Sequence, residues 1–172
     1  RVLGGPTTGL RTPAGGVYEP VENVIYVADF YGTAIRVFYA NANGDAAPTR
    51  VVGPTYPGQA RSVDVDVVHN ELLAFTSGCC YAAFDRGANG DVFFKRYVQW
   101  GGLSGSVTQQ NSPSALVYMA PTDEVAETDA DSATPYTPKV LVFNRTDSGN
   151  TAPKRMLQGT NTQFGNYAGA LA

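Results

Sequence analysis

Short apolar runs separated by turn-forming residues dominate the chain, and their spacing predicts β-strands. In the clearest part of the sequence, runs at 16–18, 24–28, 34–39 and 50–52 are rich in Val, Ile, Tyr and Phe. The third run, Ala-Ile-Arg-Val-Phe-Tyr, shows the alternation of a strand with one buried face. We therefore expect four short antiparallel strands here, with the last run as the outer strand.

The same pattern recurs along the chain. An apolar strand runs into a Gly-containing turn, and an Arg follows the turn Gly at a constant offset. These glycine–arginine pairs are Gly44 and Arg50, Gly90 and Arg96, and Gly149 and Arg155. The first two turns read Asn-Gly, which accepts the positive φ of a tight hairpin, so we expect a hairpin between the third and outer strands. A repeat of this length with several short strands is typical of β-propeller blades.

The repeat defines the organisation of the chain. The repeats run over 1–49, 50–95 and 96–154, and residues 155–172 begin a further one. The predicted fold class is all-β, a β-propeller of four-stranded antiparallel blades, with about three and a half blades in this chain. Propeller rings usually contain about four to eight blades. Three alternatives follow: the polypeptide continues, strands of a neighbouring chain complete the open blades, or the blades form a noncyclic stack with exposed edges.

One known family resembles the first repeat. Four of its segments, 13–17, 24–29, 35–38 and 43–50, are together similar to the repeats of secreted bacterial NHL-type propellers. The resemblance implies a propeller fold and a secreted protein, extracellular or periplasmic. The chain starts at Arg1 without an initiating Met, so we expect either a removed leader or a longer polypeptide.

Composition and charge narrow the classes of partner. Hydrophobic residues make up 43% and charged residues 16% of the chain, which argues against a disordered protein. The net charge of −3 gives no electrostatic basis for binding nucleic acid or an anionic membrane. No apolar run approaches the roughly 18 residues of a membrane helix. We expect neither a nucleic-acid partner nor membrane insertion.

Cys79 and Cys80 form the most unusual local feature. Adjacent cysteines can close a vicinal disulfide that rigidifies a turn, and Gly78 before them fits such a turn. A secreted setting favours this disulfide. The alternative is two thiols, one of which faces the core. Neither a CxxC nor a CxxCH sequence occurs, so a zinc site and a c-type haem are not expected.

Two groups of carboxylates are candidates for a cation or polar site. Asp64 and Asp66 are two positions apart on a predicted strand and share one face. The second group is an acidic stretch that contains Asp123, Glu124, Glu127, Asp129 and Asp131. Such oxygen ligands suit calcium. Small and polar residues between the acids favour a solvated insertion in place of the third repeat's second strand, so we expect no metal or other cofactor.

Two further residues have recognisable chemistry. His69, the only histidine, falls in a predicted turn without a Ser or Cys nucleophile pattern, which favours a solvated side chain over a catalytic one. Asn144 begins an Asn-Arg-Thr sequon and is a candidate for N-glycosylation.

The sequence therefore predicts a non-catalytic propeller that serves as a structural or binding module. Its partner would be another protein or a second copy of the chain, contacted through loops and open blade edges, within a larger chain or a polymer. The alternative is a fragment of a lactonase-like hydrolase or lyase, because some six-bladed relatives of NHL-type propellers are such enzymes. Missing blades would then complete its site. A single His and scattered carboxylates favour the first hypothesis.

Overall fold

The computed structural model describes residues 1–76, 80–130, 137–165, 169 and 171. Its strands form three four-stranded antiparallel sheets, which confirms the all-β prediction. The described residues contain no α-helix, only the short 3₁₀ turns η1 (Pro6–Thr8) and η2 (Thr160–Thr162). No helix in this part of the chain is long and apolar enough to cross a bilayer.

Each sheet is a meander in which consecutive strands pair. The first sheet contains β1 (Pro13–Glu19), β2 (Val24–Asp29), β3 (Ala34–Tyr39) and β4 (Arg50–Val52). The second contains β5 (Ala60–Asp66), β6 (Glu71–Thr76), β7 (Cys80–Asp85) and β8 (Arg96–Gln99). The third contains β9 (Ala115–Met119), β10 (Glu124–Ala130), β11 (Pro138–Asn144) and β12 (Arg155–Gln158). The four strands predicted in the first repeat are thus present.

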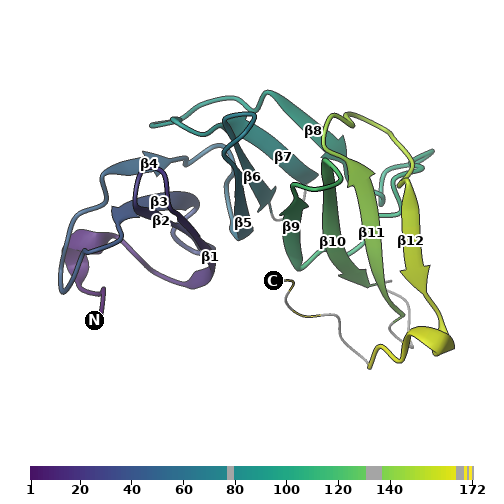
Figure 1. Cartoon of the computed structure of the whole chain (residues 1–172), viewed down its shortest axis with the longest axis horizontal. Helices are drawn as coiled ribbons and strands as arrows, with labels where there is room; N and C mark the ends of the chain where they lie inside the picture. The colour runs from purple at the N-terminus through teal and green to yellow at the C-terminus, as the bar shows by residue number, and fades with distance from the viewer. Residues whose placement is uncertain (77–79, 131–136, 166–168, 170, 172) are drawn as a thin grey trace.

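The three sheets follow one another in a propeller-like arrangement (Figure 1). Among the first strands, β5 lies between β1 and β9 and contacts both, and β4, β8 and β12 are the outer strands. Apolar clusters fill both boundaries between sheets. The first contains Tyr26, Val37, Val52, Leu72 and Phe84, and the second contains Leu73, Phe75, Val98, Leu141 and Phe143. The middle sheet is covered on both faces, so every residue of β6 is buried.

The acidic stretch is not a solvated insertion, and that prediction was wrong. Residues 124–130 form β10, which pairs with β9 and β11 and is buried at every position. The carboxylates tolerate burial because cations and backbone amides surround them, for example Arg155 at Glu124. The extra length of the third repeat lies partly in residues 100–114, between β8 and β9.

The predicted pairing of the third and outer strands is confirmed, because β3 and β4 pair antiparallel, but the prediction of a tight turn between them was wrong. Residues 40–49 separate β3 from β4, and Gly44 in this connection forms a parallel bridge with Leu3. The positive φ of Gly44, 67°, is present as expected. The turn therefore serves to hold a different segment of the chain.

Candidate functional site

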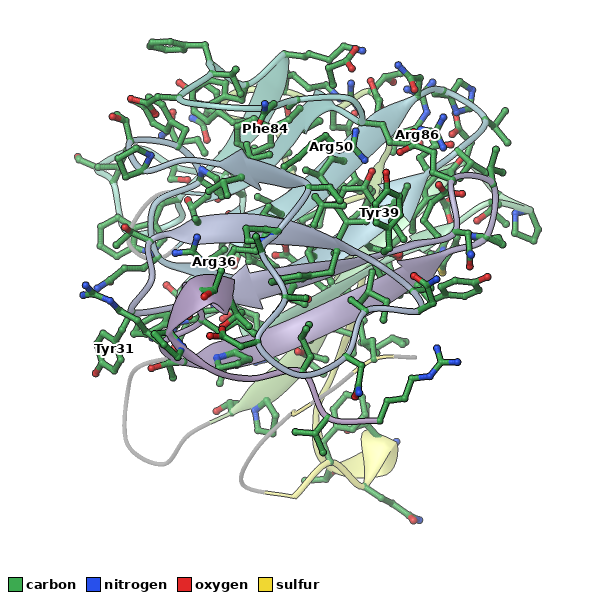
Figure 2. The ribbon with its side chains drawn as sticks, turned by 90° about the vertical axis from the view of Figure 1, so that its left-hand side faces the viewer. Tyr31, Arg36, Tyr39, Arg50, Phe84 and Arg86 are labelled. Atoms are coloured by element: carbon green, nitrogen blue, oxygen red, sulfur yellow. The ribbon has the colours of Figure 1, made fainter. Side chains whose placement is uncertain are left out.

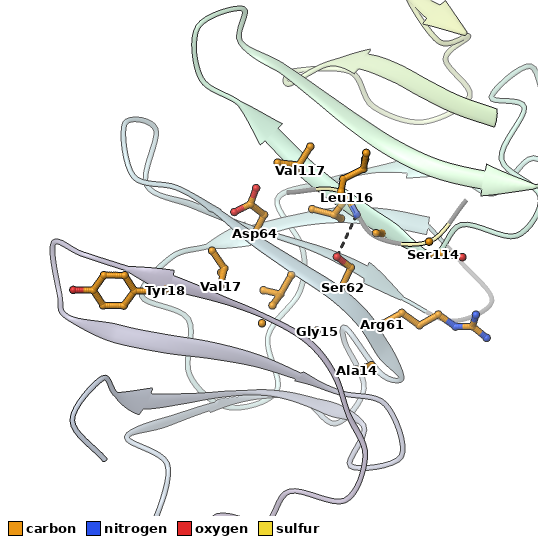
Figure 3. A pocket seen from close by; sticks show the side chains of 15 residues that line it. Ala14, Gly15, Val17, Tyr18, Arg61, Ser62, Asp64, Ser114, Leu116 and Val117 are labelled. Carbon is orange, nitrogen blue, oxygen red and sulfur yellow. Dashed lines mark hydrogen bonds between the residues drawn. The ribbon is translucent and has the colours of Figure 1, made fainter. Parts of the chain in front are cut away.

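A groove of about 700 Å³ runs between the first strands β1, β5 and β9, and we call it the axial groove (Figure 3). It is lined by residues 14–18, 61–64 and 114–117, together with Gly169 and Leu171. Gly15 allows β1 to approach β5 closely, because a Cβ there would lie 3.1 Å from the Arg61 carbonyl oxygen. Backbone and small residues such as Ala14, Gly15 and Gly16 therefore form the β1 side of the groove up to Val17 and Tyr18.

Asp64 is the carboxylate of the axial groove. Its Oδ2 accepts a hydrogen bond from the Tyr118 amide at 2.7 Å, and its Oδ1 accepts one from Val65 at 2.8 Å. Burial raises the pKa of Asp64, and these amides oppose the rise. Ser62, beside it on β5, accepts a hydrogen bond from the Leu116 amide at 3.2 Å. The groove thus offers a polar ligand one acidic group, and none of the described residues that line it is a His or a Cys.

Asp66 lies at the end of β5 in a second cluster, with His69 and Asp123. One ligand atom from each of these three residues falls within 4.8 Å of the others, a geometry that could hold a metal ion. Asp66 Oδ2 lies 2.6 Å from His69 Nδ1, and its Oδ1 accepts the Val68 and His69 amides at 3.0 Å. The histidine is therefore oriented by a buried carboxylate, although its side chain is 37% exposed.

The guanidinium of Arg145 already lies against both carboxylates of this cluster. Arg145 Nε lies 2.7 Å from Asp123 and 3.6 Å from Asp66. Tyr118 donates to Asp123 at 3.0 Å, and burial together with these carboxylates raises the pKa of the tyrosine. Arg145 directly follows β11 of the third sheet and Asp66 ends β5 of the second, so the cluster forms an ionic link between the two sheets.

A buried polar pair, Gln110 and Glu127, joins the loop before β9 to β10. Gln110 donates to Glu127 at 2.9 Å, and burial, followed by the nearby Asp129 charge, raises the pKa of Glu127 well above its usual value. One oxygen of Glu127 and one of Gln110 have no hydrogen-bond partner among the described residues. Asp129 accepts the Asn111 and Ser112 amides at 2.7 and 2.6 Å, so it fixes the loop before β9.

The arginines that head the outer strands β4 and β8 reach across to the following sheet. Arg50 Nη1 donates to the Arg86 carbonyl at 3.1 Å, and Arg96 Nε donates to the Arg145 carbonyl at 2.8 Å. The side chains of Arg50 and Arg86 are labelled in Figure 2. The two acceptor residues hold the same place after β7 and β11. The repeated arginine therefore joins neighbouring sheets.

Acidic side chains complete these links. Glu71 pairs with Arg96 and, at 3.2 Å, with Arg145. Burial alone would raise the pKa of Glu71, but the hydrogen bonds and charges of the two arginines outweigh it and lower the pKa. At the other boundary, Arg86 pairs with Glu19 at 3.1 Å.

The Gly-containing turns form a third set of links, and we call residues 43–45, 89–91 and 148–150 the docking turns. In the second, the Gly90 amide donates to the Val51 carbonyl at 2.7 Å, and the Gly53 amide donates back to Gly90 at 3.1 Å. The first turn holds Val2 and Gly4 in the same way, and the third holds Tyr97 and Gln99. Each docking turn thus binds the outer-strand segment that precedes its own sheet.

Side chains of the docking turns strengthen this contact. Asn89 Oδ1 accepts the Val51 amide at 3.0 Å. Asp91 accepts both the amide and the hydroxyl of Thr55, at 2.8 and 2.6 Å, and the hydroxyl bond is the main reason that its pKa is lowered. The sequence analysis found these turns but not their role, although the constant offset between turn and arginine was the available signal.

The outer strand of the third sheet is the exception. Leu157 on β12 is 55% exposed, whereas its counterparts Val52 and Val98 are 0% exposed. The Arg155 side chain is 52% exposed, against 15% for Arg96. We call the exposed surface of β12 and η2 the open edge.

The described structure does not bring the remaining predicted site residues together. Cys79 and Asp131 lie outside the described residues, as does the side chain of Cys80, so the disulfide stays a prediction. Asn144 is exposed, and its side-chain amide donates to Asp147 at 3.3 Å. Asp64 and Asp66 both contact the third sheet, but they belong to the axial groove and to the ionic cluster respectively.

Comparisons with known proteins support the fold. The sequence matches no family model and no curated protein. Among solved structures, hydrazine synthase of Kuenenia stuttgartiensis is similar, with a TM-score of 0.62 and 9% sequence identity. The match covers 85% of this chain and 37% of that one, so the present chain spans only part of its length. At this identity the likeness shows the fold alone, a propeller-like arrangement of β-sheets.

Proposed function

We propose that this chain is a segment of a secreted β-propeller that serves as a non-catalytic binding module. Its three sheets are blades of one ring, and its open edge contacts another protein surface. The observation that carries the proposal is the exposure of Leu157, at a position that is fully buried in both preceding sheets. An exposed apolar side chain on an outer strand marks a surface whose burial against a partner is favourable.

The geometry of the axial groove supports a binding role over catalysis. Its acidic group, Asp64, is held by two backbone amides, and the described lining contains no nucleophile with an adjacent base. A binding groove requires only shape and a few polar contacts, which backbone and Ser62 supply.

A lactonase-like hydrolase is the second candidate, and Asp64 is the observation that favours it. A half-buried carboxylate with a raised pKa in such a groove is a typical acid–base group. Metal analysis and a panel of lactones and esters test this candidate on protein purified from its source. If the protein turns over a substrate and Asp64→Asn abolishes that turnover, the enzyme candidate replaces the binding proposal. If the protein holds no metal and turns over no substrate, the binding proposal is supported.

Amide hydrogen exchange tests the binding proposal directly. Met156, in the middle of β12, holds the place of Val51, whose amide points out of its sheet to Asn89. In protein isolated from its source, we expect the Met156 amide to exchange at least about tenfold more slowly than in the purified 172-residue chain.

The Val51 amide is the matched control, because its partner is inside the chain and it should be equally protected in both samples. Fast exchange at Met156 in the native material, with Val51 still protected, would show that nothing covers the open edge.

A further inference from the structure

We propose that the partner at the open edge is a further propeller blade of the same repeat, which inserts a docking turn of the form Asn/Ser-Gly-Asp/Asn against β12. This inference rests on the proposed binding function and names its partner. The docking is seen three times inside the chain, where each docking turn forms a parallel bridge with a preceding segment. The open edge is a fourth segment of the same kind.

The segment after β12 already has the conformation of a docked one. In η1, the Thr8 amide and hydroxyl both donate to the Gly5 carbonyl, at 3.2 and 2.7 Å. In η2, the Thr162 amide and hydroxyl donate to the Gly159 carbonyl at 3.1 and 2.7 Å. Thr8 is fully buried and Thr162 is not. The surface is therefore preorganised for a partner, which lowers the entropic cost of binding.

The N-terminal segment shows which side chain recognises such a surface. Asp45 of the first docking turn accepts the Thr7 amide at 2.6 Å and its hydroxyl at 2.9 Å. Asn161 holds the position of Thr7 in η2, so its amide is placed to donate to the last residue of an incoming turn. An Asp or Asn at that place would supply the acceptor.

Charge gives a second feature of the partner. Glu71 is contacted by Lys95, Arg96 and, from the following sheet, Arg145. Glu124 holds the same register position in the third sheet, paired with Asn144 as Glu71 is with Asp85. Its cation partners among the described residues are Lys154 and Arg155. The incoming blade would add an arginine after its third strand.

A second copy of this chain does not fit these requirements. All of its docking turns are already filled, the first by Val2 and Thr7 and the others by β4 and β8. Its first sheet also carries Ala40 at the place of Arg86 and Arg145. The partner blade is therefore one outside residues 1–172.

Site-specific photo-crosslinking tests this assignment. A photoreactive amino acid replaces Met156, which is 46% exposed, in the full-length protein expressed in its own organism. We expect an adduct on a peptide with the Asn/Ser-Gly-Asp/Asn sequence that is not 43–45, 89–91 or 148–150 of this chain. An adduct on one of those three turns would mean self-association, and an adduct on an unrelated sequence would mean a different partner. Both would overturn the inference while leaving the binding function intact.

An extended chain provides a second, independent test. Residues 11–53, with Ala40→Arg, are copied after Phe164, because residues 155–164 match 1–10 in phase. The control carries the same copy with Gly44→Val and Asp45→Ala in its turn. We expect Met156 exchange to slow at least about tenfold in the first protein only. Equal exchange rates in the two proteins, with Val51 protected in both, would overturn the inference.

Discussion

The outer strands β8 and β12 have similar sequences and very different surroundings. Both begin with an arginine and carry an apolar residue two positions later, Val98 in β8 and Leu157 in β12. Val98 is buried in the second apolar cluster, whereas more than half of Leu157 is exposed, at 55%. A repeated pattern therefore specifies what each strand is able to bind, and the neighbouring sheet decides whether it does so.

The largest difference should come from a charge at these two positions. Val98→Asp places an unpaired carboxylate in an apolar cluster and should cost about 3 kcal/mol or more. Leu157→Asp in the same 172-residue chain should cost under about 1 kcal/mol, because water reaches the site. Urea unfolding measures both. Equal losses would mean that the open edge is covered within this chain.

The arginines that head the two strands should differ next. Arg96→Ala removes one of the three cation partners of the buried Glu71 and the donor to the Arg145 carbonyl, so we expect a loss of about 2 to 3 kcal/mol. Arg155→Ala should cost less, since its guanidinium is half exposed and Lys154 still pairs with the buried Glu124. A larger effect of Arg155→Ala than of Arg96→Ala would contradict the comparison.

The central strands of the second and third sheets, β6 and β10, should contribute differently to the pH dependence of stability. Glu127 stands in β10 where β6 has Ala74, and its pKa is raised by burial. The folded protein then holds a proton that the unfolded chain releases above about pH 4.3, so stability falls as pH rises from there toward the folded pKa. We expect a slope on the order of 1 kcal/mol per pH unit in that range. Glu127→Gln should remove it, as thermal unfolding from pH 4 to 8 would show.

If the stability of the wild-type protein and that of Glu127→Gln depend on pH in the same way, this explanation is wrong. Glu71 provides a control of opposite sign, because its pKa is lowered. Its stabilisation is complete above about pH 4.3 and is lost as pH falls through the folded pKa, so Glu71→Gln should remove stability near neutral pH.

The smallest effect should distinguish two docking turns. Asn89→Ala removes the acceptor of the Val51 amide at a boundary between two sheets and should cost about 1 kcal/mol. Asn43→Ala removes the equivalent bond to Val2, which is near the chain terminus and largely exposed, so only local exchange at Val2 should increase. If Asn43→Ala costs as much as Asn89→Ala, the N-terminal segment is as firmly held as β4.

Strand positions in the first repeat followed from the sequence alone, because alternating apolar residues require one buried face. The second strand of the third repeat did not. The sequence shows three acidic residues there, which alone predict an exposed segment: Glu124, Glu127 and Asp129. Their burial is possible only because cations, backbone amides and Gln110 surround them in the folded chain. The axial groove was likewise beyond prediction, since it depends on how β1, β5 and β9 meet.

By itself, the sequence determined the repeat, the all-β class and the arginine at a constant distance from each turn glycine, because these are local patterns of period and spacing. The tertiary structure alone decided that the turns hold the preceding outer strand and that the arginines join neighbouring sheets. It also decided that β12 remains exposed. The physical reason is that contacts between sheets depend on which surfaces meet in space, and a repeated sequence presents the same surface each time, whether or not a partner covers it.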